Sequence, residues 1–308
     1  MRKFVLLQVI FCLLLTGAFL AYHYAPAKAS ITGCINILAS PNYLSTNQES
    51  DAIAALNNAH RYEHLPPLRL PADYYHLNPA QQQFLLLNQE RTDRGLRPLA
   101  VDANLAQMAL AYSRQLKQLP FFSHTSPIGG SFEERINQNP ALNNHYSLAA
   151  ENLAGNPVAG AGAIYEYMYN DSLEACGHRH NILNPRFTLV GINWVYGSVY
   201  GSISAMEFLA SSPWNPYTSP APDTLAPQVT IAVKHAGNTP LFSCKALAQD
   251  NVGVVRLTWF LDRFGNQPHL GPDWSLDTRN LSPGKHTLLL YAVDGEQNYS
   301  MASYSFVA

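Results

Sequence analysis

Residues 177–185 read Gly177-His178-Arg179-His180-Asn181-Ile182-Leu183-Asn184-Pro185, a run that combines two histidines with two asparagines. Two earlier stretches also carry ionisable side chains among small polar residues: Phe122-Ser123-His124-Thr125-Ser126-Pro127 and Ala150-Glu151-Asn152-Leu153-Ala154. Imidazole and carboxylate groups bind metals and transfer protons near neutral pH. His124, Glu151 and His178 are therefore candidate site residues, although long segments separate them.

A fourth block precedes these three and runs from Asn88-Gln89-Glu90-Arg91 to Gly95-Leu96-Arg97-Pro98-Leu99. In this order, the four blocks resemble the CAP superfamily of cysteine-rich secretory proteins, antigen 5, plant pathogenesis-related proteins and bacterial SCP-like proteins. The motif Gly-His-Arg-x-Asn-Ile-Leu is similar to the corresponding block in the bacterial branch of this superfamily. Over residues 78–210, the resemblance implies an α-β-α sandwich with a central cleft lined by two histidines and two acidic residues.

By this resemblance, His124 and His178 match the two histidines of the cleft, and Glu151 matches its first acidic residue. Two imidazoles could hold a divalent metal, Zn²⁺ or a similar ion, with Glu151 as a further ligand or as a general base on bound water. The structural alternative is a hydrogen-bonded His–Glu–His network that holds three segments together. Because no activated nucleophile is evident, we expect a binding protein rather than an enzyme.

The second acidic residue of the cleft has no direct counterpart. The family has a Glu three residues after an aromatic on the preceding helix, and here the third residue after Tyr167 is Asn170. The position is either lost or shifted to the adjacent Asp171, which would then be the weakest metal ligand. Residues 60–64 separately fit the inverted zincin pattern H-x-x-E-H, but a polar helix end is the simpler explanation there.

Composition and local patterns support a mixed α+β domain followed by an all-β domain. The chain has 308 residues and is 47% hydrophobic with a net charge of −2, which excludes a mostly disordered chain and a nucleic-acid-binding footprint. Asn78 and Pro79 begin a helix that Gly95 ends, and Asp102 caps a second helix. A third helix is expected over 162–171, and a hairpin over 189–209.

Outside residues 78–210, the sequence predicts four further regions. Residues 30–77 form an irregular extension with one short helix over 50–64, and residues 211–227, with five prolines, form a semi-rigid linker. Residues 228–308 contain short runs of period two and are expected to form a small Ig-like β-sandwich, with Cys244 as a buried lone thiol.

The fourth region, residues 1–29, has the features of a signal peptide or an N-terminal membrane anchor. Arg2 and Lys3 precede an apolar run over 4–21, and Ala27-Lys28-Ala29 is a small-x-small cleavage pattern. A lipobox at Cys34 is a third alternative, and whether Cys34 pairs with Cys176 stays open. In each case the rest of the chain is exported, either secreted or tethered to the bacterial envelope.

We therefore expect a secreted or envelope-tethered CAP-domain protein. Its His/Glu-lined cleft is a binding site, with divalent-cation dependence as a further expectation, and its Ig-like module serves adhesion or spacing. The ligand would be an extracellular lipid, peptide or polysaccharide, and the chain would be a monomer that binds no nucleic acid. The alternatives are a metal-dependent hydrolase of peptide or cell-wall substrates and an extracellular lipid or sterol carrier.

Overall fold

The computed structural model describes residues 48–171, 175–235 and 239–308, all of which fall in one compact unit, Cys34–Ala308. The expected signal or anchor segment and Cys34 lie outside the described residues. None of the described helices is long and apolar enough to cross a membrane.

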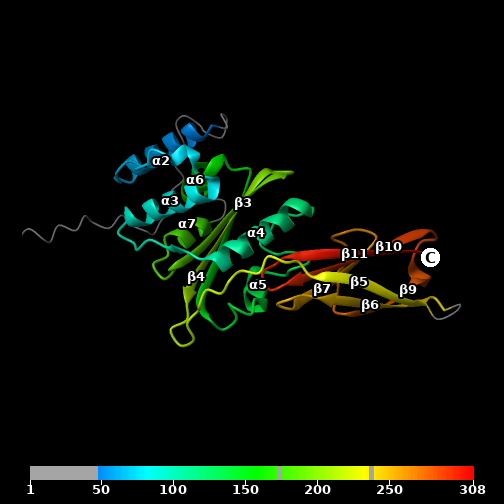
Figure 1. Ribbon diagram of the computed structural model, residues 1–308. Helices are drawn as coiled ribbons and strands as arrows, with labels where there is room; N and C mark the ends of the chain where they lie inside the picture. The colour runs from blue at the N-terminus through cyan, green and yellow to red at the C-terminus, as the bar shows by residue number, and fades with distance from the viewer. Residues whose placement is uncertain (1–47, 172–174, 236–238) are drawn as a thin grey trace, which may run out of the picture. The chain divides into compact units, whose positions relative to one another are not determined.

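A four-stranded sheet in the order β1-β3-β4-β2 is the centre of the first domain. Its strands are β1 (Ala100–Val101), β2 (Tyr146–Gly155), β3 (Leu189–Ser198) and β4 (Gly201–Ser211). Its helices are α2 (Glu49–Tyr62), η2 (Tyr74–His76), α3 (Pro79–Thr92), α4 (Ala103–Gln118), α5 (Phe132–Gln138), α6 (Ala159–Tyr169) and α7 (Gly177–Ile182). Figure 1 shows α4 and the group of α2, α3 and α6 around this sheet.

Alternate residues of β4 face opposite helices. Ile203 and Ala205 pack with Ala109 and Tyr112 of α4, whereas the Ser204 hydroxyl donates a hydrogen bond to Gln83 of α3. Because side chains alternate along a strand, this contact pattern places helices on both faces of the sheet. The predicted α+β class, with an α-β-α sandwich first, is confirmed.

The helix starts follow from local capping chemistry. Asn78 and Gln81 form a capping box at the start of α3, and the Asp102 carboxylate accepts a hydrogen bond from Leu105 N–H at the start of α4, as the sequence predicts. The helix expected over 50–64 is α2, but it does not lie in a separate irregular extension. It packs on α6, and its apolar face, with Leu56 at 0% exposure, is fully buried.

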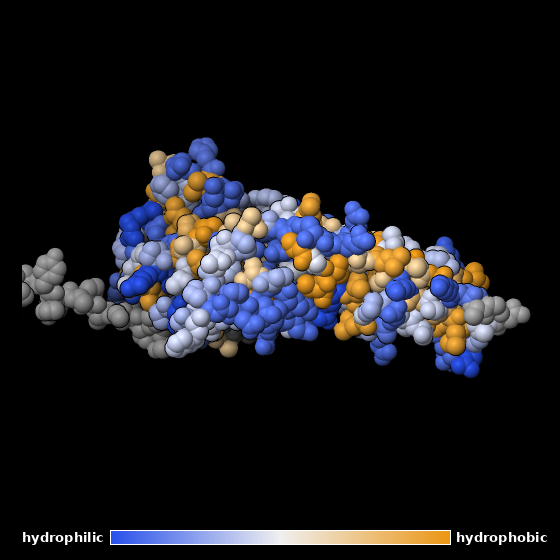
Figure 2. Space-filling view, turned by 60° about the horizontal axis from the view of Figure 1, so that its bottom comes forward, coloured by the Kyte–Doolittle hydropathy of each residue, from blue (hydrophilic) through white to orange (hydrophobic). Residues whose placement is uncertain are grey.

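The C-terminal domain consists of two antiparallel sheets, in the orders β11-β10-β7-β8 and β5-β6-β9. Its elements are β5 (Gln228–His235), β6 (Leu241–Gln249), β7 (Val254–Leu261), β8 (His269–Leu270), β9 (Asp273–Asp277), η4 (Thr278–Asn280), β10 (Lys285–Asp294) and β11 (Tyr299–Val307). Trp259 and the free, buried Cys244 lie in the core between the sheets. The all-β expectation is therefore confirmed. On the face of the molecule that Figure 2 shows, apolar residues lie among hydrophilic ones.

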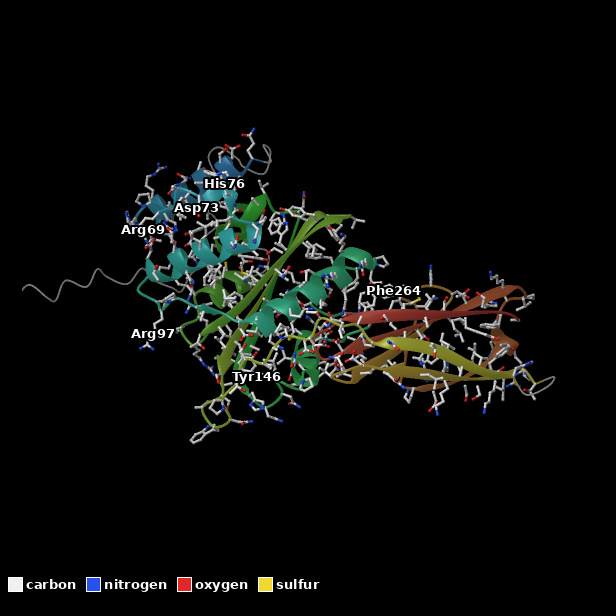
Figure 3. The ribbon with its side chains drawn as sticks, viewed as in Figure 1. Arg69, Asp73, His76, Arg97, Tyr146 and Phe264 are labelled. Atoms are coloured by element: carbon white, nitrogen blue, oxygen red, sulfur yellow. The ribbon has the colours of Figure 1, made fainter. Side chains whose placement is uncertain are left out.

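The linker and the turn between β10 and β11 both contact the first domain. The Tyr217 hydroxyl donates a hydrogen bond to Asp102, and the Asn104 amide of α4 donates one to Glu296 at 3.1 Å. Phe264, labelled in Figure 3, stacks at a tilt on Phe121 with the ring centroids 6.2 Å apart. The segment expected to be a linker therefore contacts the first domain through Tyr217.

Candidate functional site

Glu151 lies in the middle of β2, which is the edge strand of the first sheet. Its cross-strand partner is Glu207 of β4, so the two carboxylates are on the same face. Because no strand of the described residues lies beyond β2, segments from both faces of the sheet can meet beside it. The segment after α4 brings His124, the residue after the C-cap of α6 is Asp171, and α7 brings His178.

Arg135 of α5 binds the Glu151 carboxylate. Its guanidinium nitrogen Nη2 donates to both carboxylate oxygens, at 2.8 and 2.9 Å, and its Cζ lies 3.5 Å from the centroid of the Tyr112 ring. Burial by itself would raise the pKa of Glu151, but the charge of Arg135 and the hydrogen bond from His124 outweigh it and lower the pKa. Glu151 is therefore ionised and fully engaged at neutral pH.

Glu207 is the second carboxylate beside Arg135, and its side chain is also fully buried. Its Oε1 lies 3.9 Å from the Arg135 nitrogen Nη1. Burial and the charge of Glu151 raise the pKa of Glu207 well above its usual range, so Glu207 holds a proton where Glu151 does not. Neither Arg135 nor Glu207 belongs to a motif of the sequence, although a single Glu in the otherwise apolar run of β4 is a signal for Glu207.

Each histidine of the site has its own carboxylate on Nδ1. His124 Nδ1 lies 2.7 Å from Glu151 Oε1, and His178 Nδ1 lies 2.6 Å from Asp171 Oδ1. The second oxygen of Asp171 accepts the backbone N–H of Arg179 at 3.0 Å, so this carboxylate is fixed at the start of α7. Asn170 instead donates to Glu166 on the same helix. The structure thus places Asp171, and not Asn170, beside the second histidine.

The two imidazole rings lie near each other, with centroids 6.4 Å apart. Ionised carboxylates only accept hydrogen bonds, so each Nδ1 carries the proton and each Nε2 keeps its lone pair. No described residue hydrogen-bonds to either Nε2. Two imidazoles on one tetrahedral ion would have centroids about 5.2 Å apart, so a shift of about 1 Å would let both bind the same ion. The His124 side chain is 51% exposed and has room for that movement.

These contacts decide how the four candidate ligands could be used. Glu151 and Asp171 orient the histidines and are engaged with other donors, so His124 and His178 are the residues whose free nitrogens fit a metal. Among the described residues, three potential ligand atoms lie within 4.8 Å of one another at Asp223, Asp250 and Asp294, and not at these histidines.

The zincin-like run at residues 60–64 belongs to a buried ionic network. His60 Nε2 lies 3.0 Å from Glu90 Oε1, and His60 Nδ1 donates to the Pro66 carbonyl. Glu63 pairs with Arg94 and Arg179. His60 and Glu63 therefore join α2 to α3 and α7, whereas His64 is exposed, so the zincin pattern matches by accident.

Residues 84–208 match the cysteine-rich secretory protein (CAP) family. Two proteins of Bacillus subtilis (strain 168) are similar over part of their length. The uncharacterized protein YkwD is 34% identical over 124 residues, which are 40% of this chain and 44% of YkwD. The uncharacterized membrane protein YlbC is 31% identical over 114 residues, which are 37% of this chain and 31% of YlbC. The similarity thus spans less than half of either relative.

Among solved structures, an extracellular protein containing a SCP domain from Bacillus anthracis is 29% identical to this chain, with a TM-score of 0.37. The similarity covers 47% of this chain and 44% of that one. The sequence blocks and the α-β-α layers that carry them are those of a CAP domain of the bacterial type, and residues 84–208 belong to that family.

Proposed function

We propose that the chain is an extracytoplasmic binding protein whose His124–His178 pair holds a divalent cation, and with it a polar extracellular ligand. The observation that carries this proposal is the pairing of each Nδ1 with its own carboxylate, at 2.7 and 2.6 Å, which leaves both Nε2 lone pairs available. A bound cation would supply positive charge for a ligand oxygen. The C-terminal sandwich would act as an adhesion or spacer module.

Binding is favoured over hydrolysis because Glu151 is poorly suited to act as a general base. Its two oxygens already accept hydrogen bonds from Arg135 and His124, and its pKa is lowered. A base that works near neutral pH needs a raised pKa and access to bound water. Export is supported by the N-terminal apolar run and by the extracellular description of the Bacillus anthracis relative.

The test is a calorimetric titration of the full chain, purified without chelator or affinity tag, with Zn²⁺. We expect one ion per chain, and loss of binding in His124→Ala and in His178→Ala. His180→Ala is the matched control, because His180 is exposed on the same helix as His178. Equal loss in the control, or no Zn²⁺ binding by the wild type, would contradict the proposal. Metal-dependent turnover of a peptide or cell-wall substrate would replace it with the hydrolase alternative.

A further inference from the structure

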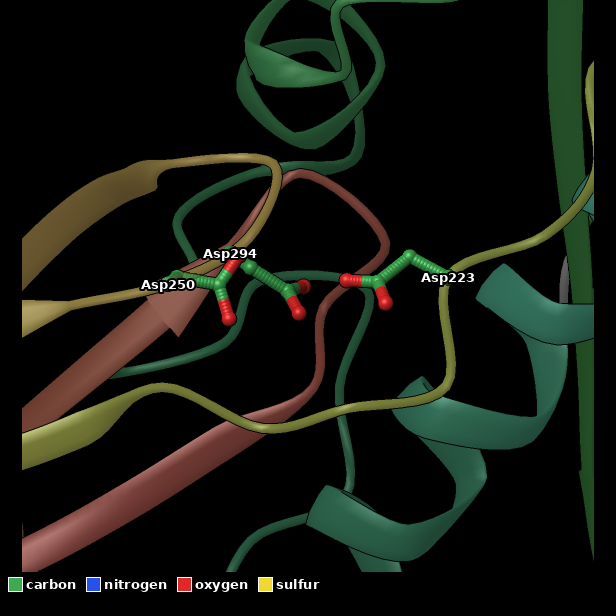
Figure 4. Close-up of side chains that lie close together, drawn as sticks. All are labelled: Asp223, Asp250 and Asp294. Carbon is green, nitrogen blue, oxygen red and sulfur yellow. The ribbon is translucent and has the colours of Figure 1, made fainter.

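A second group of ionisable side chains lies outside the histidine site, where the linker meets the C-terminal sandwich. Asp223 comes from the linker, Asp250 follows β6, and Asp294 ends β10. One carboxylate oxygen of each lies within 4.8 Å of the other two, and Figure 4 shows the side chains converging. Asp223 is 8% exposed and Asp294 is fully buried. Three carboxylates from three segments of the chain thus lie close together, and two of them are buried.

Hydrogen bonds hold these carboxylates in place without neutralising them. Asp223 and Asp250 each accept two hydrogen bonds at Oδ1, and Asp294 accepts two from Asn298. Among the described residues, no Lys, Arg or His forms an ion pair with any of the three. Buried carboxylates without a counter-charge are costly, because burial removes the water that would stabilise them.

Unpartnered oxygens provide the second observation. Asp223 Oδ2 is buried and has no hydrogen-bond partner, and the same holds for Oε2 of Glu296, a residue that is only 5% exposed. Glu296 follows Asp294 by two residues and interacts electrostatically with Asp223 and Asp250, so it lies beside the same group. Buried polar atoms in folded proteins are nearly always satisfied, and an ion is one of the partners that can satisfy them.

The close approach of these like-charged groups has the same implication. Carboxylate oxygens of Asp223, Asp250 and Asp294 lie within 4.8 Å of one another, and like charges at this separation repel one another. A divalent cation between the carboxylates would turn this mutual repulsion into shared attraction.

We propose that Asp223, Asp250 and Asp294 bind one Ca²⁺ ion, with Glu296 as a fourth carboxylate beside it. The donor set is made of oxygen only, which suits a hard cation and disfavours Zn²⁺, whose protein ligands are mainly nitrogen and sulfur. Ca²⁺ accepts several carboxylates in a flexible shell, whereas Mg²⁺ keeps most of its water and uses one or two. This site does not depend on the function proposed for the histidine pair.

The location indicates what the ion would do. Glu296 accepts a hydrogen bond from Asn104 of α4, and the Asp223 carbonyl accepts one from Asn298 of the turn between β10 and β11. An ion bound to the carboxylates would therefore fix the linker to the sandwich and, through Glu296, to the CAP domain. The two domains would be held in one arrangement when Ca²⁺ is present.

The test uses the full chain, stripped with EGTA and then titrated with CaCl₂ by calorimetry and by thermal unfolding. We expect one Ca²⁺ per chain, and a rise in melting temperature of roughly 5 °C or more at about 100 times Kd. Asp223→Asn and Asp250→Asn keep the accepting oxygen and remove the charge, so both variants should fold. Each should bind Ca²⁺ at least about tenfold more weakly, and without Ca²⁺ neither should melt lower than the wild type.

Two controls separate this site from other causes. Asp73→Asn, an exposed residue labelled in Figure 3, should leave the Ca²⁺ response unchanged, and so should His124→Ala. The proposal is overturned if the wild type shows no heat and no thermal shift up to about 10 mM Ca²⁺, above the Kd range of extracellular Ca²⁺ modules. It is also overturned if Asp223→Asn and Asp250→Asn bind like the wild type, and equal stabilisation by Mg²⁺ would overturn the assignment to Ca²⁺.

Discussion

Replacing Arg135 with Met would remove the guanidinium that faces two buried carboxylates. Arg135 is fully buried, and it donates to both oxygens of Glu151 and lies 3.9 Å from Glu207. Met preserves much of the apolar contact with Tyr112, so the loss is mainly electrostatic. Removing one partner of a buried ion pair costs about 3–5 kcal/mol, and we expect a loss of unfolding free energy in that range at pH 7.

Urea unfolding of the full chain measures this loss, and Arg114→Met is the control because Arg114 is exposed on α4 and should change stability by less than about 0.5 kcal/mol. Arg135 helps to lower the pKa of Glu151. A carboxyl with a lowered pKa stabilises the fold above its unfolded-state pKa, and this stabilisation is lost as the pH falls. The difference between wild type and Arg135→Met should therefore stay constant from pH 7 to about pH 5 and shrink as the pH falls below the unfolded-state pKa of about 4.3. A loss below about 1 kcal/mol at pH 7, or one that does not depend on pH, would refute this account of the site.

Three further changes test other parts of the structure. Because the pKa of Glu207 is raised in the fold, the wild type should lose stability as the pH rises above the unfolded-state pKa of about 4.3. In urea unfolding between pH 5 and 8, the unfolding free energy of Glu207→Gln should rise relative to that of the wild type by up to about 1.4 kcal/mol per pH unit. Parallel pH profiles of the two proteins would argue against a protonated Glu207. Leu56→Ala in α2 should cost about 2–5 kcal/mol in the same assay, whereas a negligible cost would show that α2 is not part of the packed domain. Asp171→Asn should weaken Zn²⁺ binding about 10- to 100-fold by calorimetry, because Asp171 orients His178, and unchanged affinity would remove that role.

Much of the fold could be predicted from local patterns, because these patterns describe contacts within a few residues. Asn78 and Asp102 predict the starts of two helices, because their side chains accept hydrogen bonds from the backbone N–H groups three residues later. The period-two runs after residue 228 predict strands because side chains alternate across a sheet. His124, Glu151 and His178 were found through the family resemblance, which preserves their order along the chain.

The tertiary structure alone decided the rest of the histidine site. Spacing could not choose between Asn170 and Asp171, and the choice depends on where α6 ends and how the chain returns to α7. The register between β2 and β4 places Glu207 opposite Glu151, and α5 then carries Arg135 between them. Such pairings join residues far apart in sequence, so no local pattern encodes them.

The same reason applies to the acidic cluster at the linker. Asp223, Asp250 and Asp294 each look like ordinary turn residues in the sequence, because Asp is common in turns. Only the docking of the linker beside the β6–β7 turn and the end of β10 brings their oxygens within 4.8 Å. A charge that is harmless when solvated becomes costly when it is buried among like charges, and that burial is a property of the packed chain and not of any segment.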